Sequence, residues 1–304
     1  MTQKKLLLGT AQWGWTVPRE EAFRLLDAWL AAGHRAVDAA TNYPINKNPA
    51  DFRAAENILL EYVQAHGLRD LDITMKIGSM DNMRSPEANL SPSFVLMMAT
   101  EYARLFGENL RVVMLHWDNR DESPAIHATL EALANAQKEL GVRPGISGVK
   151  HPEAYVQANM DLGLSFDIQL KHNVLHSDLP RYAAFSGPEH RRYAYGINAG
   201  GLKLEAPYPA GSTFLARGGD PEKAAAVLEK IRTTLPKWNT AFVRPPLRTM
   251  NQIGLIYAAL HPDLDGLVLG FSSLAQLQET LDFWRNLDTF DYTDVMSTLI
   301  KHFQ

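Results

Sequence analysis

Short runs of apolar residues alternate with longer segments of helical periodicity from one end of the chain to the other. Eight of the short runs are apolar enough to be buried on both faces, as the strands of a parallel sheet are. They are Leu6–Gly9, Arg35–Asp38, Ile73–Lys76, Val112–His116, Gly145–Val149, Phe166–Leu170, Tyr193–Tyr195 and Gly266–Leu269. Eight strand–helix units in roughly 250–300 residues are typical of a closed (β/α)8 TIM barrel, so we expect residues 1–304 to form one α/β domain. The alternative is an open, doubly wound sheet, but no G-x-G-x-x-G sequence follows the first strand.

Proline and glycine residues indicate where the helices between these strands begin and end. The pairs Ser91–Pro92 and Ser123–Pro124 are typical of helix starts. The glycines predicted to end helices are Gly33, Gly67, Gly141 and Gly163.

Two further segments lie outside the repeating pattern. The connection Lys203–Arg248, after the seventh strand, is long enough to hold a loop that covers a ligand, a helix at Pro221–Thr234 and a proline break at Pro245–Pro246. An additional amphipathic helix is predicted at Asp291–Phe303, after the last barrel unit.

Composition narrows the class of protein. The 304 residues are 46% hydrophobic and 21% charged, with a net charge of -4 and no block of Lys or Arg, which argues against a nucleic-acid partner. No apolar run approaches the ~18–20 residues of a membrane span, and no signal-peptide pattern precedes the first strand. Cysteine is absent, which excludes disulfides, thiolate metal sites and a cysteine nucleophile. We therefore expect a cytoplasmic protein with no membrane partner.

Polar residues gather at the carboxyl ends of three successive predicted strands. Asp38 ends the second strand and Tyr43 follows it, while Lys76 and His116 end the third and fourth. Side-chain alternation turns Asp38, Lys76 and His116 toward the barrel interior, where the strand ends converge on one site. A buried carboxylate needs a cationic partner, and Lys76 is the candidate for Asp38.

This group of residues suits reduction of a carbonyl. A lysine ammonium next to a tyrosine favours the phenolate, so Tyr43 is suited to give a proton to a carbonyl oxygen as hydride reaches the carbon. His116 can hold and polarise the same oxygen. A Lys–Asp pair alone is equally suited to a structural role, but four such residues at adjacent strand ends favour the catalytic interpretation.

Other chemistries are less well supported by the sequence. His151, His172 and His176 follow the fifth and sixth strands, but the first strand lacks the histidines of a metallohydrolase barrel, so we expect no metal. A Schiff-base role for Lys76 is opposed by its carboxylate neighbour, which keeps the lysine protonated. Trp15 and Trp117 flank the predicted site and suit either packing or an aromatic wall for the substrate.

The same residues resemble the catalytic tetrad of the aldo-keto reductase family. The matching motifs are Asp38–Ala39–Ala40–Thr41–Asn42–Tyr43, Ile73–Thr74–Met75–Lys76–Ile77–Gly78 and Val113–Met114–Leu115–His116. The resemblance implies an NAD(P)(H)-dependent oxidoreductase that reduces an aldehyde or ketone, or oxidises the alcohol or sugar. It makes Tyr43 the general acid, with Lys76 and Asp38 tuning it and His116 orienting the carbonyl.

Further motifs resemble the family's nucleotide-binding segments, in order along the chain. They imply contacts with the nicotinamide region from Gln12, Trp13, Ser147, Gln169 and Tyr195, with the pyrophosphate from Gly200, and with the adenosine phosphate from Gly270, Ser272, Gln276 and Glu279.

The chain also departs from the family pattern. Gly148 stands where the family has the asparagine that helps to hold the carboxamide, and Gly270, Gln276 and Thr280 stand where many members have Lys, Arg and Asn. The 2′-phosphate of NADP(H) thus lacks its usual cations there, for which Lys203 or Arg217 can substitute. NADP(H) is the expected cofactor and NAD(H) its rival.

Two functional classes follow from the resemblance. The first is an enzyme that acts on a small carbonyl substrate, whose identity the sequence leaves open together with the oligomeric state. The second is a catalytically weak, nucleotide-sensing binding protein, such as the potassium-channel beta subunits that share this fold.

Overall fold

Eight parallel strands form a closed barrel in the computed structural model, which describes residues 4–205, 208, 212–216 and 218–303. The barrel strands are β1 (Lys5–Gly9), β2 (Ala36–Ala40), β3 (Asp72–Ile77), β4 (Leu110–His116), β5 (Arg143–Ser147), β6 (Asp167–Asn173), β8 (Arg191–Tyr195) and β9 (Gly266–Leu269). Their order is β5-β4-β3-β2-β1-β9-β8-β6, and the pairing of β5 with β6 closes the ring. The predicted (β/α)8 barrel is confirmed.

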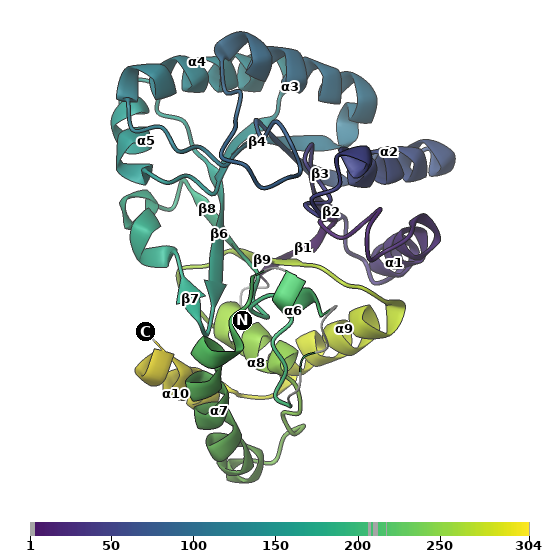
Figure 1. Cartoon of the computed structure of the whole chain (residues 1–304), viewed down its shortest axis with the longest axis vertical. Helices are drawn as coiled ribbons and strands as arrows, with labels where there is room; N and C mark the ends of the chain where they lie inside the picture. The colour runs from purple at the N-terminus through teal and green to yellow at the C-terminus, as the bar shows by residue number, and fades with distance from the viewer. Residues whose placement is uncertain (1–3, 206–207, 209–211, 217, 304) are drawn as a thin grey trace.

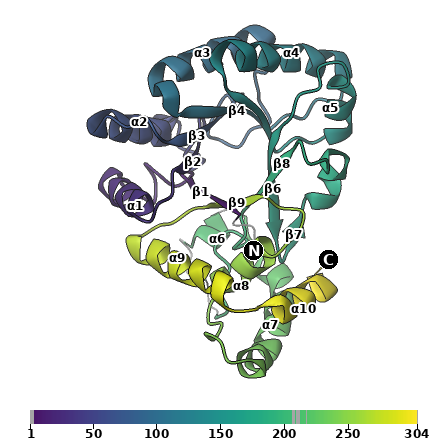
Figure 2. The same cartoon turned by 180° about the vertical axis from the view of Figure 1, so that it is seen from behind.

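Helices surround the ring of strands (Figures 1 and 2). Those between successive strands are α1 (Arg19–Ala31), α2 (Ala54–His66), α3 (Pro92–Phe106), α4 (Ser123–Leu140), α5 (Pro152–Ala158) and α8 (Met250–Ala259), and α9 (Leu274–Thr289) follows the last strand. Short 3₁₀ helices occur at η1 (Pro49–Asp51), η2 (Gly107–Asn109) and η3 (Leu179–Phe185), and η3 takes the place of an α-helix between β6 and β8.

Side-chain alternation divides the core into two layers. Val37, Ile73 and Met75 point outward and pack with the helices in one large cluster. Leu7, Ala36, Tyr193 and Val268 form a second, separate cluster inside the barrel. The inward positions of β2 and β3 are therefore those that carry Asp38 and Lys76, as the alternation predicts.

Some element boundaries differ from the sequence predictions. The strand predicted at Gly145–Val149 ends at Ser147, because Gly148 has a left-handed φ of 66° that breaks the extended backbone. Gly67 and Gly141 cap α2 and α4 as expected, but α5 ends at Ala158 and Gly163 lies beyond a following turn. A two-residue strand, β7 (His176–Ser177), forms an unpredicted antiparallel hairpin with the end of β6.

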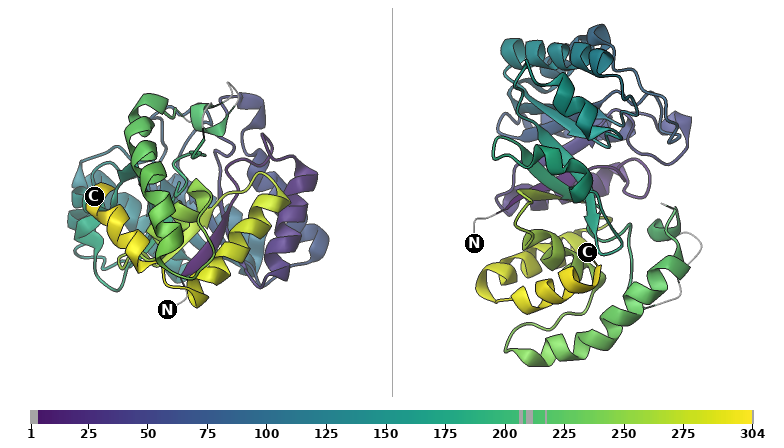
Figure 3. Two further views of the ribbon diagram at one scale, coloured as in Figure 1. Left: turned by 90° about the horizontal axis from the view of Figure 1, so that it is seen from below. Right: turned by 90° about the vertical axis from the view of Figure 1, so that its left-hand side faces the viewer.

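The long connection after β8 carries α6 (Thr213–Ala216) and α7 (Pro221–Ala241). The latter passes through Pro236 instead of ending near Thr234, and it extends along the outside of the molecule (Figure 3). Residues 206, 207, 209–211 and 217 of this connection, among them Arg217, lie outside the described residues.

The predicted C-terminal helix is α10 (Thr293–Phe303), which packs against α7 and α8. Arg244 fixes its start by donating two hydrogen bonds to Asp294, at 2.6 and 2.8 Å. Within the described ranges, no helix combines the length and apolarity needed to cross a membrane.

Candidate functional site

Asp38, Lys76 and His116 lie inside the barrel near the carboxyl ends of β2, β3 and β4, and Tyr43 lies in the loop after β2. The pairing register connects these positions, because Ala40 pairs with Lys76 and Lys76 pairs with Met114. The structure therefore brings together the four side chains that the sequence singled out.

Asp38 is the centre of a buried network of three side chains. Its Oδ2 atom accepts a hydrogen bond from the Lys76 ammonium at 2.5 Å, and its Oδ1 atom accepts one from the Gln169 amide at 2.6 Å. The ammonium also donates to Gln169 Oε1 at 3.2 Å. Because β6 lies across the ring from β2, Gln169 reaches the pair through the barrel interior. Both ends of the Gln169 amide thus engage the ion pair, and the predicted contact with the cofactor carboxamide stays a prediction.

Lys76 carries its positive charge next to the Tyr43 ring. Burial alone would lower the pKa of this lysine, but Asp38 and Tyr43 outweigh it and raise the pKa above its ordinary value. The ammonium lies 4.9 Å from the centroid of the Tyr43 ring. A fixed cation is thus present where a tyrosine phenolate would form.

His116 completes the group from the β4 side. Its ring is perpendicular to that of Tyr43, with the two centroids 6.0 Å apart. Burial, with a smaller contribution from the Lys76 charge, holds the pKa of His116 well below its usual value, so the imidazole is neutral at physiological pH. Its Nδ1 atom is buried and has no hydrogen-bond partner among the described residues. A buried polar atom without a partner at a barrel mouth suits contact with a ligand.

Trp117 follows His116 and is held against it. Its φ of 62° is left-handed, which costs a residue with a side chain on the order of 1–3 kcal/mol and persists only where the surroundings enforce it. The indole centroid is 4.6 Å from that of His116. A Cβ added to Gly148 would come within 2.5 Å of Trp117 Cδ1, so the indole packs directly over that glycine. An asparagine at position 148, which the family pattern would place there, would clash with the Trp117 indole, and the glycine avoids that clash.

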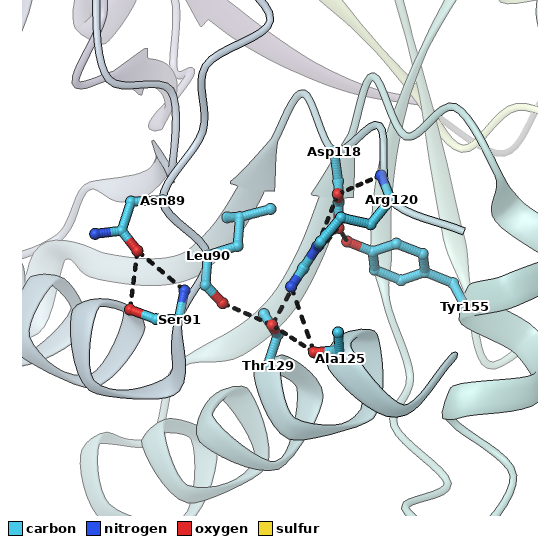
Figure 4. Close-up of polar contacts among 8 residues, drawn as sticks. All are labelled: Asn89, Leu90, Ser91, Asp118, Arg120, Ala125, Thr129 and Tyr155. Atoms are coloured by element: carbon cyan, nitrogen blue, oxygen red, sulfur yellow. Dashed lines mark hydrogen bonds and ion pairs between the residues drawn. The ribbon is translucent and has the colours of Figure 1, made fainter. Parts of the chain in front are cut away.

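A network that the sequence reasoning missed lies directly after Trp117 (Figure 4). The Asp118 carboxylate is buried and accepts hydrogen bonds from Arg120 Nε, from Arg120 Nη2 at 2.8 Å and from the Tyr155 hydroxyl at 2.5 Å. Arg120 Nη2 also donates to Thr129 Oγ1 at 3.1 Å. Burial, and then the Asp118 charge, raises the pKa of Tyr155 well above its usual value, so its hydroxyl stays protonated and donates. A carboxylate and an arginine two residues apart, directly after a strand, were the available signal.

The residues predicted to contact the nicotinamide lie on neighbouring strand ends. Ser147 pairs in register with both His116 and Gln169. Tyr195 ends β8 and is partly buried, and burial raises its pKa, with Asp178, Tyr182 and Tyr43 as lesser causes. These polar groups next to His116 fit a nicotinamide at this mouth.

The two tryptophans of the loop between β1 and α1, both predicted near the site, differ in their exposure to solvent. Trp13 is completely buried in the outer core cluster, so its indole offers no surface to a bound nucleotide. Gln12 is 9% exposed, and Trp15 is partly exposed. The predicted contact of the Trp13 side chain therefore does not match its packing.

Glycines determine the backbone of the segment predicted to bind the pyrophosphate. Gly200 and Gly201 have φ values of 82° and 104° in the loop after β8, which brings backbone rather than side chains to this position.

At the start of α9, Gln276 Oε1 accepts from the Ser272 amide and hydroxyl, and the Leu274 amide donates to Glu21 of α1 at 2.9 Å. Gly270 and Glu279 are exposed, whereas Thr280 is buried and accepts from Asn251. Of the residues predicted to meet the adenosine phosphate, Ser272 and Gln276 thus bind each other, and none of the four carries a positive charge.

In the part of the chain that the structure describes, the predicted histidines do not assemble with acidic residues into a metal-binding group. In the ranges that the structure describes, no three His, Asp or Glu side chains are grouped closely enough to hold a metal ion. His172, one of the three histidines singled out in the sequence, has a packing role: it is buried between the barrel and the helices, with its ring stacked on that of Tyr257 and the two centroids 4.5 Å apart.

Comparisons with known proteins agree with this geometry. The model of the aldo/keto reductase family matches residues 5–299. Among solved structures, the holo form of the aldo-keto reductase AKR11C1 from Bacillus halodurans superposes with a TM-score of 0.73 at 17% identity, covering 99% of this chain and 92% of that one. A search of the curated proteins finds no match. The family match spans nearly the whole chain, and we conclude that this protein belongs to the aldo/keto reductase family of NAD(P)H-dependent carbonyl oxidoreductases.

Proposed function

We propose that this protein reduces a small aldehyde or ketone, or oxidises the corresponding alcohol or sugar, with Tyr43 as the proton donor. The observation that carries the proposal is the buried Lys76–Asp38 pair, whose ammonium lies 4.9 Å from the Tyr43 ring centroid. The nicotinamide, when bound, supplies the hydride to the carbonyl carbon. The Tyr43 hydroxyl gives its proton to the carbonyl oxygen, and the reverse transfer serves alcohol oxidation.

Lys76 and Asp38 stabilise the charge that this proton transfer leaves behind. The phenolate of Tyr43 forms next to a cation, which lowers its free energy relative to a neutral environment. Asp38 and Gln169 both accept hydrogen bonds from the ammonium, so its position is fixed before the reaction. No reorganisation of the lysine is then needed when the charge appears.

His116 orients the carbonyl in this proposal. A neutral imidazole can donate one N–H bond to a carbonyl oxygen without adding a second cation next to Lys76. Ser147, Tyr195 and Gln12 are proposed to contact the nicotinamide, and Gly200 is proposed to contact the pyrophosphate. Trp15 and Trp117 are both partly exposed at this mouth and are proposed to line the substrate pocket.

For the nucleotide we propose NADP(H), with Lys203 as the cation for the 2′-phosphate. Lys203 is exposed on the long connection after β8, and its side chain has no ion pair among the described residues. NAD(H) is the rival choice, because the carboxylate of Glu21 lies at the start of α9, where it would repel a phosphate.

The proposal is tested by titrating NADPH and NADH against the protein by fluorescence, and then screening aldehydes and ketones with the tighter nucleotide. Turnover of any small carbonyl, abolished in Tyr43→Phe while nucleotide binding is kept, supports the proposal. Tight nucleotide binding without turnover across the screen would refute it and would favour a nucleotide-sensing protein instead.

A further inference from the structure

The loop after β4, residues 117–120, is held by many hydrogen bonds to one buried carboxylate, that of Asp118. Asp118 accepts two bonds from Arg120 Nε, one to each oxygen, at 3.0 and 3.1 Å, in addition to the contacts with Nη2 and Tyr155. Its Oδ1 atom also accepts from the Arg120 amide at 2.9 Å. A carboxylate this buried is stable only when its oxygens are satisfied in this way.

The same segment is connected to the neighbouring loops and helices. Arg120 binds Thr129 of α4, and Thr129 donates to the Leu90 carbonyl at 2.6 Å, just before α3. Tyr155 belongs to α5, and the Lys150 amide donates to the Asp118 carbonyl at 2.8 Å. The network therefore ties the loop after β4 to the segment just before α3, to α4 and to α5 (Figure 4). The Lys150 amide adds a contact with the loop after β5.

Trp117 is the residue whose position this network determines. Its amide donates to the Ser147 carbonyl at 2.9 Å, its indole lies between His116 and Gly148, and its backbone has the left-handed conformation. Asp118 follows directly, so holding its carboxylate limits the backbone rotation that would release Trp117.

We propose that Asp118 is a positioning residue of this reductase, which with Arg120 and Tyr155 holds the Trp117 indole beside His116 as a fixed wall of the carbonyl pocket. The wall sets which carbonyls reach Tyr43 and His116: a flat aromatic aldehyde gains contact with the indole, whereas a small aliphatic aldehyde gains little. The inference rests on the proposed function, because its kinetic test needs turnover of a carbonyl. Its spectroscopic test needs no turnover.

The spectroscopic test follows the indole directly. The chain has six tryptophans, so 5-fluorotryptophan labelling gives a ¹⁹F spectrum in which the Trp117 signal is identified by its loss in Trp117→Phe. We expect Asp118→Asn to shift or broaden the Trp117 signal and to leave the other five unchanged. Asp121→Asn, at an exposed acid of the same loop, serves as the control and leaves all six unchanged. An unchanged Trp117 signal in Asp118→Asn would overturn the proposal.

The kinetic test is a double-mutant cycle with two probes, 4-nitrobenzaldehyde and propanal. We expect Asp118→Asn to raise KM for 4-nitrobenzaldehyde about tenfold with kcat within about threefold, and to change KM for propanal less than twofold. In a Trp117→Ala background the same substitution changes KM for 4-nitrobenzaldehyde less than twofold, because the wall is already gone. An equal effect in both backgrounds, or on both aldehydes, would mean that Asp118 acts only on stability and would overturn the proposal.

A milder variant keeps the test valid if Asp118→Asn does not fold. Tyr155→Phe removes a single hydroxyl from the network, and we expect it to affect the Trp117 signal and the KM for 4-nitrobenzaldehyde in the same direction by a smaller factor. Absence of turnover in the parent protein would refute the proposed function, while the ¹⁹F result would still decide whether Asp118 positions Trp117.

Discussion

Lys76→Met separates a catalytic role of the buried ion pair from a structural one. Taking the ring centroid as the position of the phenolate charge, the distance of 4.9 Å and an effective dielectric constant of about 20 give an interaction of about 3 kcal/mol. Loss of that interaction from the step that charges Tyr43 predicts a decrease in kcat of roughly a hundredfold.

The same substitution leaves the Asp38 carboxylate buried with only the Gln169 amide as a partner. Removing one member of a buried pair costs on the order of 3–5 kcal/mol of unfolding free energy. For a chain of this length that corresponds to a decrease in Tm of about 5–8 °C.

The assay pairs turnover with thermal unfolding for Lys76→Met and for Lys76→Met/Asp38→Asn. We expect the double variant to regain most of the lost Tm, because no unpaired charge remains, while its kcat stays low. Lys138→Met, at an exposed lysine of α4, is the control and changes neither quantity. Recovery of kcat together with Tm in the double variant would show that the pair is structural and would refute the reasoning.

Three further predictions test other parts of the account. Burial lowers the pKa of His172 to about 4, below the unfolded value of about 6.5, so the unfolded state binds a proton at this residue first as the pH falls. We therefore expect the free energy of unfolding to fall by about 2 kcal/mol between pH 8 and pH 5, measured by denaturant unfolding. His172→Gln should not show this loss. We expect Gly148→Ala to lower the free energy of unfolding by about 1–2 kcal/mol, because residue 148 has a left-handed backbone, and to displace Trp117. An unshifted Trp117 signal in the ¹⁹F spectrum would contradict the packing of the indole on Gly148. Lys203→Ala should weaken NADPH binding about tenfold and leave NADH binding unchanged, and an equal effect on both nucleotides in a fluorescence titration would exclude a role with the 2′-phosphate.

The sequence predicted the barrel because its strands are buried on both faces and alternate with helices. It also predicted the meeting of Asp38, Lys76 and His116, because inward positions at the ends of adjacent parallel strands must converge. It missed β7, since a two-residue hairpin has no periodicity of its own. It ended α7 too early, because the helix passes through Pro236, a residue that usually interrupts one.

The contact of Gln169 with Asp38 and that of Tyr155 with Asp118 join residues far apart in the sequence, so no local pattern contains them. Gln169 meets Asp38 only because β6 and β2 face each other across the closed ring. Asp118 also accepts a hydrogen bond from Tyr155, thirty-seven positions away on α5. Trp13 was placed at the cofactor by motif alone, whereas packing buries its indole in the core.

Tyr43→Phe gives the most direct test, because it removes one hydroxyl and leaves the ring next to Lys76 and His116. Stopped-flow and steady-state kinetics with the preferred nucleotide and its best carbonyl substrate would be measured together with the nucleotide Kd. We predict that Kd stays within about twofold and that kcat falls by about 10²–10⁴-fold, the range that positioned proton donors contribute. A variant that turns over at the rate of the parent would contradict the assignment of Tyr43 as the proton donor.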